Sequence, residues 1–336
     1  MPTGRTTKLR PVIVAALVIV ASCNQPRPSA HQQLQRVKIS QFHMGMMIHL
    51  TLWAPTLEVG QQAAAAAFSR VGEIDQIMSD YDADSELSHL CRRSGQGPVP
   101  VSEELFLVLT TARQLAELTA GRYDPTIGPL TRLWREARQT GVPTIQSRID
   151  AAKQLVGYEK LLLDTKSRTV ELTHPGMRLD LGSIAKGYAG DEALRILKER
   201  GISSAAYEAG GDKVFGAPPP GEKGWPVEIE ATLPKISPLA NCAVSISGDS
   251  EQFFLHEGKR YGHIIDPKTG SSYILHATCI VIARKGLEAD PLSTIGTMMP
   301  RASYLAFLRQ HFPDVVATVF APSDSDRSDG PRIPPL

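Results

Sequence analysis

Apolar positions recur along the chain with two different periods. Between residues 61 and 78 they are spaced by three and four, which predicts an amphipathic helix. The same spacing follows Ser102, a suitable N-cap residue, and stops at Gly121. Further helices are predicted over 185–201, over 301–311, and as a short helix after Ser147 with Asp150 in a capping arrangement.

Short runs of aliphatic and β-branched residues predict the strands. They lie at 46–53, 170–172, 177–181, 204–207, 227–229, 243–247, 279–283 and 315–320. Helices and strands do not alternate in regular βαβ units, so we assign the α+β class. We expect mixed, largely antiparallel sheets flanked by helices.

The first 23 residues have the pattern of an export signal. Three basic residues precede an uninterrupted apolar run from Val12 to Val20. This run is far shorter than the roughly 20 residues of a membrane-spanning helix, and it matches the core of a signal peptide. The sequence Val-Ala-Ser-Cys that ends at Cys23 resembles a bacterial lipobox, whose cysteine becomes lipidated. The alternative is a secretory peptide that is cleaved nearby, with Cys23 incidental.

These features define the expected domain organisation. Residues 1–22 would be the signal peptide, 23–40 a lipid-anchored polar tether, and 41–322 one folded domain. Residues 323–336 are polar and rich in proline, so we expect a disordered tail. The remaining cysteines, Cys91, Cys242 and Cys279, fit no zinc-binding spacing, and we expect them to be small buried apolar residues.

Composition and net charge limit the kinds of partner that this protein can be expected to bind. The 336 residues include 42% hydrophobic and 21% charged residues, as in an ordinary globular protein. Lysine plus arginine is 36 and aspartate plus glutamate is 35, which gives a net charge of +1. A nearly neutral chain without a long basic run argues against nucleic acid as the main partner.

Glycine and aspartate are concentrated in a few segments. These segments are 81–87, 121–130, 179–191 with 209–212, and 247–249 with 263–270 and 289–294. In the third segment a strand, a glycine turn and a helix start would offer backbone N–H groups to an anion, and Lys186 adds a charge suited to phosphate. The same pattern also fits a glycine-capped turn with an exposed lysine.

Other candidates have equally simple alternatives. Asp290 and Thr294 are four residues apart and would share a helix face, where their oxygen atoms are the kind of ligand that Mg²⁺ prefers. They could instead be a helix N-terminal carboxylate and a buried threonine. His263 lies where a strand would meet a turn, so its role could be catalytic or structural. Tyr81 could stack on a planar ring or lie partly buried at the surface.

Taken together, the segments resemble the ApbE family, the FAD:protein FMN transferases. The resemblance extends from about residue 44 to 297. It rests on Leu-Asp-Leu-Gly-x-Ile-Ala-Lys-Gly-Tyr at 179–188, Gly-Gly-Asp at 210–212, Ser-Gly-Asp at 247–249 and His-Ile-Ile-Asp-Pro-x-Thr-Gly at 263–270. The chain departs from the family at Pro291 and Ser293, where small residues are usual, and at Glu208, near which an asparagine is usual. Pro291 would be tolerated if Asp290 capped a helix and Pro291 were its first residue.

The resemblance implies a crevice between subdomains that holds FAD, with Mg²⁺ at the pyrophosphate. The side chains of Asp290 and Thr294 and the main-chain carbonyl of Ser183 would be the metal ligands. The positions that would line FAD are Met44, Tyr81, Tyr123, Asp124, Asp180, Lys186 and Ile264.

The activity implied is Mg²⁺-dependent transfer of FMN from FAD to a threonine of an exported flavoprotein, with release of AMP. His263 is the expected general base, because an unperturbed histidine titrates near neutral pH, and Asp180 is the alternative. The implied partners are FAD, an acceptor flavoprotein with a threonine motif, and the membrane, through lipidated Cys23 on the periplasmic or extracytoplasmic face. Two alternatives remain: a Mg²⁺-dependent FAD pyrophosphatase that gives FMN and AMP, and a non-catalytic FAD-binding lipoprotein.

Overall fold

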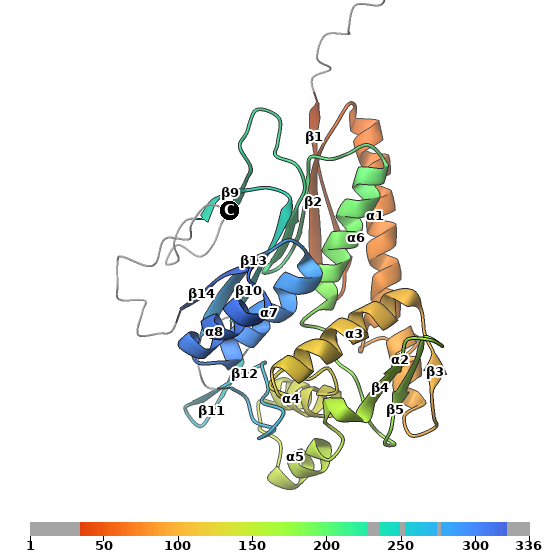
Figure 1. Ribbon diagram of the computed structural model, residues 1–336, viewed down its shortest axis with the longest axis vertical. Coiled ribbons are helices and arrows are strands. Elements are labelled where there is room, and N and C mark those ends of the chain that lie inside the picture. Colours follow the sequence, from red (N-terminus) through yellow and green to blue (C-terminus); the bar gives the residue numbers. More distant parts are fainter. Residues whose placement is uncertain (1–33, 228–235, 249–252, 274–276, 321–336) are drawn as a thin grey trace, which may run out of the picture. The chain divides into compact units, whose positions relative to one another are not determined.

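The computed structural model describes residues 34–227, 236–248, 253–273 and 277–320 (Figure 1). The predicted signal peptide, the tether up to residue 33 and the predicted tail from 323 lie outside the described residues. Among the helices in the described ranges, none combines the length and apolar character needed to cross a membrane.

A seven-stranded sheet forms the centre of the described domain, in the order β1-β2-β6-β7-β10-β13-β14. Every neighbouring pair in it is antiparallel. This arrangement confirms the α+β class. The strands are β1 (Gln35–His43), β2 (Met46–Ala54), β6 (Ala205–Ala209), β7 (Asp212–Phe215), β10 (Cys242–Ser247), β13 (Thr278–Ala283) and β14 (Val316–Phe320).

Helices cover one face of this sheet (Figure 1). They are α1 (Leu57–Met78), α6 (Ala185–Glu199), α7 (Gly286–Met298) and α8 (Arg301–His311). Alternate residues of β2, including Ile48, Leu50 and Leu52, are fully buried against them, as a half-buried strand requires. A second apolar cluster covers the other face, where β8 (Trp225–Val227) and β9 (Ile236–Leu239) form a hairpin.

The remaining elements come mostly from the middle of the chain. The helices are α2 (Glu86–Arg92), α3 (Glu103–Leu118), α4 (Gly128–Thr140), α5 (Gln146–Lys153) and a 3₁₀ turn (Tyr158–Lys160). A three-stranded sheet has the order β3 (Val99–Pro100), β5 (Thr169–Leu172), β4 (Leu161–Asp164). The hairpin of β11 (Phe253–His256) and β12 (Lys259–Gly262) lies between β10 and β13 in the sequence.

The long periodic helices were predicted correctly, but three local predictions were wrong. Residues 177–181 form no strand; apart from a bridge between Ile127 and Arg178, they are an irregular segment that leads into α6. Helix α5 begins at Gln146 without a side-chain cap, and Asp150 accepts a hydrogen bond from the Gln146 side chain instead.

The third correction concerns the tether over 23–40. Its last six residues belong to the folded domain, because β1 begins at Gln35 and pairs with β2 from Gln35 opposite Ala54. The buried Val37 and the partly buried Ile39 alternate with polar residues and fix the inward face of this edge strand. The expectation for the cysteines is confirmed, since Cys91, Cys242 and Cys279 are all free and buried.

Candidate active site

The beginnings of α6 and α7 meet at the end of the sheet where β7 starts and β10 finishes. Their backbones touch: a Cβ atom added to Gly187 would lie 2.1 Å from the carbonyl oxygen of Gly286. Only glycine allows this approach. Asp191 of α6 completes the junction, because its carboxylate accepts hydrogen bonds from the backbone N–H groups of Gly286 (2.7 Å) and Leu287 (2.9 Å).

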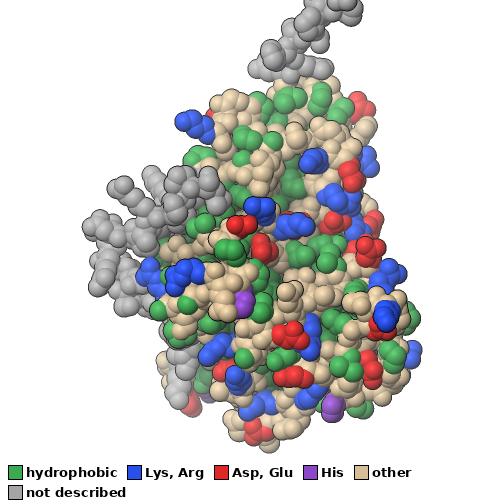
Figure 2. Space-filling view, in the orientation of Figure 1, with side chains coloured by type: hydrophobic (Ala, Val, Ile, Leu, Met, Phe, Trp, Pro, Cys, Tyr) green, Lys and Arg blue, Asp and Glu red, His purple; other side chains and the backbone are tan. Residues whose placement is uncertain are grey.

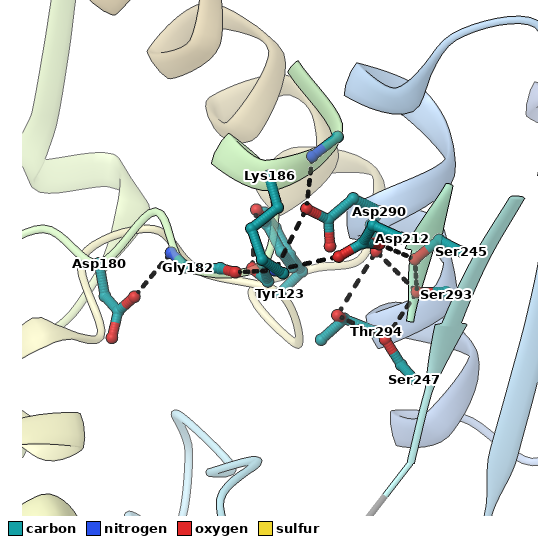
Figure 3. Close-up of polar contacts among 12 residues, drawn as sticks. Tyr123, Asp180, Gly182, Lys186, Asp212, Ser245, Ser247, Asp290, Ser293 and Thr294 are labelled. Atoms are coloured by element: carbon teal, nitrogen blue, oxygen red, sulfur yellow. Dashed lines mark hydrogen bonds and ion pairs between the residues drawn. The ribbon is translucent and has the colours of Figure 1, made fainter. Parts of the chain in front are cut away.

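Lys186 lies between two carboxylates at this junction (Figure 3). Its Nζ is 3.3 Å from Oδ2 of Asp212 and 3.5 Å from Oδ2 of Asp290, and it donates to the carbonyl oxygen of Gly182 at 2.5 Å. The Gly187 N–H also donates to Asp290, at 3.1 Å. Lys186 is therefore not the solvent-exposed lysine of a simple glycine-capped turn, because three anionic or carbonyl oxygens surround it.

Burial dominates the electrostatics of this cluster. It raises the pKa of Asp290, and the negative charge of Asp212 adds to the effect; Lys186 opposes both, and the resulting pKa is about 7. Burial alone would lower the pKa of Lys186, but Asp290 and Asp212 outweigh it, so its pKa is raised and the ammonium stays charged. Two buried carboxylates thus share one ammonium, and the cluster carries an excess negative charge when both are ionised.

A row of hydroxyl groups continues from the carboxylates. Ser293 Oγ lies 2.8 Å from Ser245 Oγ and 2.6 Å from Ser247 Oγ, and Thr294 Oγ1 lies 3.2 Å from Ser247 Oγ. Ser245 also donates to Asp212. The predicted metal ligands Asp290 and Thr294 are therefore in one cluster. Ser293, which departs from the family pattern, is a fully buried link between β10 and α7.

The local structure expected at Pro291 was wrong. Helix α7 begins at Gly286, so Pro291 lies inside the helix and Asp290 is not its cap. Asp191 takes the capping role from a neighbouring helix. A proline at this depth removes one helical N–H donor, to the carbonyl four residues earlier.

Ser183 and Tyr123 lie in loops beside the cluster of Lys186, Asp212 and Asp290. Ser183 Oγ donates to the Tyr123 hydroxyl at 3.3 Å, and burial raises the pKa of Tyr123. Asp124, another position predicted to line FAD, holds its own turn together. Its carboxylate accepts hydrogen bonds from both the N–H and the hydroxyl of Thr126 and from the Tyr158 N–H.

Asp180 belongs to a second charged group. Its Oδ1 accepts from the Gly182 N–H at 2.9 Å, and Figure 3 shows that it lies beyond Gly182 from the Lys186 cluster. Its Oδ2 accepts from Arg135 Nη2 at 2.7 Å. Arg135 also pairs with Asp80 and lies over the ring of Tyr81, with the guanidinium carbon 4.2 Å from the ring centroid.

The remaining predicted site residues, Met44, Ile264 and His263, lie outside the helices and strands. Met44, with φ of 51°, is in the β1–β2 turn, where its N–H donates to Asp75 at 2.7 Å. Ile264 is 9% exposed, and its carbonyl accepts from the Tyr273 N–H. His263 comes directly after β12 and is exposed, so solvent can reach it.

Sequence reasoning had not assigned roles to several of these residues. Asp212 was part of the recognised Gly-Gly-Asp segment but was not assigned to the site. Asp80 directly precedes Tyr81, which gives a weak signal. Arg135 is a single arginine on a helix and gives none.

Charges of both signs are mixed on the face of the molecule that Figure 2 shows. Neither sign covers a broad area of this face, which agrees with the net charge of +1. Glu208, at the departure from the family, pairs with Lys213 across the β6–β7 hairpin at 3.6 Å. Within the described ranges, no three histidine, cysteine, aspartate or glutamate side chains gather as a metal site.

Comparison with known proteins identifies relatives over most of the chain. The model of the ApbE family matches residues 44–319. The FAD:protein FMN transferase of Vibrio cholerae serotype O1 is 29% identical over 295 residues, which cover 84% of this chain and 85% of the relative.

Solved structures with the same fold include two that cover most of this chain. The ApbE protein of Thermotoga maritima has a TM-score of 0.76 at 28% identity, covering 86% of this chain and 95% of that one. A mutant of the flavin transferase ApbE from Vibrio cholerae has a TM-score of 0.76 at 27% identity, with coverage of 85% and 97%.

Proposed function

Because the chain belongs to the ApbE family, we propose that it transfers FMN from FAD to a protein and that the acceptor group is a threonine hydroxyl of an exported flavoprotein. AMP is the leaving group. The observation that carries the proposal is the cluster of Lys186, Asp212 and Asp290. It brings two of the recognised sequence segments, 179–191 with 209–212 and the one that ends at 289–294, to one point at the beginnings of two helices whose N-termini favour anions.

The cluster also suits Mg²⁺. The oxygen atoms that could bind the ion belong to carboxylates and hydroxyls, the hard ligands that Mg²⁺ prefers, and the excess negative charge of the cluster favours a cation. Asp290 and Thr294 would hold the ion through their side chains, and Ser183 through its carbonyl. When bound, Mg²⁺ would neutralise negative charge on the pyrophosphate of FAD.

The chain's own residues supply the remaining chemistry. Lys186 keeps its positive charge beside the two carboxylates, so it can stabilise negative charge on a phosphate bound near the cluster. We propose His263 as the base that takes the proton from the threonine hydroxyl, since it is exposed where an acceptor protein can reach it. Asp180 is the alternative base; its two oxygens accept hydrogen bonds from Arg135 and from the Gly182 N–H.

We also propose that the protein works outside the cytoplasm, attached to the membrane by a lipid on Cys23. The lipobox-like sequence supports this, and β1 begins only twelve positions after Cys23, at Gln35. A tether of this length keeps the domain close to the membrane surface.

The deciding experiment incubates the purified protein with FAD, Mg²⁺ and a flavoprotein acceptor that carries the threonine motif. Mass spectrometry should find the acceptor heavier by one FMN, and chromatography should find AMP. Free FMN plus AMP without an adduct would instead indicate an FAD pyrophosphatase. Unchanged FAD would indicate a binding protein without catalytic activity.

A further inference from the structure

The guanidinium of Arg135 joins two loops that are about one hundred residues apart in the sequence. Arg135 projects from α4, and its Nη2 donates to Asp180 in the loop before α6 at 2.7 Å. Its Nη1 donates to Asp80 in the loop after α1. A planar guanidinium presents its N–H groups in a rigid fork, so it holds two carboxylates in a fixed geometry, whereas a lysine ammonium is a point charge on a flexible stem.

Without Arg135, the two carboxylates would repel each other. Both side chains are only 11% exposed, so solvent screens them little. Burial and the charge of Asp180 raise the pKa of Asp80, and Arg135 acts in the opposite direction. Arg135 therefore determines how closely the Asp80 and Asp180 loops approach.

The same guanidinium supports Tyr81. The residue is 74% exposed, yet the centroid of its ring lies 4.2 Å from the guanidinium carbon, a distance at which cation–π attraction holds the ring in place. An exposed tyrosine without such a contact would sample several rotamers. Tyr81 thus presents a fixed aromatic surface to solvent, to which a planar ring can bind.

We propose that Arg135 is a positioning residue of the transfer reaction. It holds the Tyr81 ring and the Asp180 carboxylate in one arrangement, ready for FAD. This inference rests on the proposed function, because that function is what makes FAD the ligand of Tyr81 and Asp180. Arg135 acts through these two residues and not on the reacting phosphorus.

The first test compares Arg135→Gln and Arg135→Lys with Arg132→Ala, an exposed arginine on the same helix. FAD affinity is measured by quenching of flavin fluorescence, and kcat and KM are measured by FMN transfer. We expect Arg135→Gln to weaken FAD binding and raise KM about tenfold or more, while kcat at saturating FAD changes about threefold or less. Arg135→Lys should recover part of the loss, and Arg132→Ala should match the wild type.

A double-mutant cycle with Tyr81→Ala separates positioning from a general loss of stability. If Arg135 acts through Tyr81, Arg135→Gln should weaken FAD binding much less in the Tyr81→Ala protein than in the wild type. Equal effects in both backgrounds, or unchanged FAD affinity in a folded Arg135→Gln protein, would overturn the inference. The affinity measurements need no transfer, so a wild type that binds FAD but modifies no acceptor would refute the proposed function alone.

Discussion

Replacing Asp290 by asparagine should make the metal-free protein more stable and the enzyme inactive. Burial and Asp212 raise the pKa of Asp290 to about 7, compared with 3.8 for an ordinary aspartate. Each pKa unit corresponds to about 1.4 kcal/mol, so ionised Asp290 costs up to about 4 kcal/mol of folding free energy at pH 8. The substitution also removes one of the partners of Lys186, which keeps Asp212 and the Gly182 carbonyl. We expect a net gain of about 1–3 kcal/mol.

The raised pKa of Asp290 also determines the direction in which the unfolding free energy changes with pH. Between about pH 4 and pH 7 the folded protein holds a proton that the unfolded chain has released, so the unfolding free energy falls as the pH rises through this range. Urea denaturation in EDTA at pH 6 and pH 8 should therefore show a wild type that is weaker at pH 8 and an Asp290→Asn variant with a smaller difference. The control is Asp314→Asn, a carboxylate whose side chain is 73% exposed.

Two outcomes would refute this reasoning. One is an Asp290→Asn protein that is less stable than the wild type at pH 8 in EDTA. The other is a variant that still transfers FMN at the wild-type rate with Mg²⁺ present, because the proposed metal ligand would then be dispensable.

Three further substitutions test the contact between α6 and α7, the proposed base and the proposed lipid anchor. Gly187→Ala should destabilise the protein by about 1–3 kcal/mol and remove transfer, because the new Cβ meets the Gly286 backbone. The control is Gly72→Ala on α1, whose Cβ would lie no closer than 3.4 Å to His43. Equal melting temperatures of the two variants would contradict the prediction. His263→Ala should slow FMN transfer about a hundredfold while FAD affinity is retained, measured as initial rate and fluorescence titration; a near wild-type rate would leave Asp180 as the base to test. Cys23→Ser should move the protein from the membrane fraction to a soluble or unprocessed form, and an unchanged distribution with no acyl label on the wild type would argue against lipidation.

Local pattern predicted the elements that pack with a regular period. The helix ending at Met78 and the helix after Ser102 bury one face each, so the spacing of their apolar residues determined them. Residues 177–181 have the alternation of a strand, but Leu179 and Leu181 are buried beside an irregular backbone whose bonds go to other loops, such as the Asp180 N–H to Pro125. The spacing of apolar residues shows which positions are buried, but a buried segment does not have to pair with a neighbouring strand through backbone hydrogen bonds.

The site was predictable to the extent that its residues fall in contiguous motifs. Lys186, Asp290 and Thr294 were candidates from sequence and lie in one cluster in the structure. Asp80 and Arg135 could not be found this way, because their pairing depends on how α4 packs beside two distant loops. A salt bridge between residues 55 positions apart leaves no local pattern.

The backbone contact between Gly187 and Gly286 couples opening of the Lys186–Asp290 cluster to cooperative unfolding of the domain. Lys186 and Asp290 are immediate neighbours of this contact, and Asp191 ties the beginning of α7 to α6. Neither helix can open by itself without separating the charges that define the site. Local opening of the two helix starts, of the kind that is common in loops, therefore has little room here. Hydrogen exchange at the two helix starts should require the same opening free energy as the centre of the sheet.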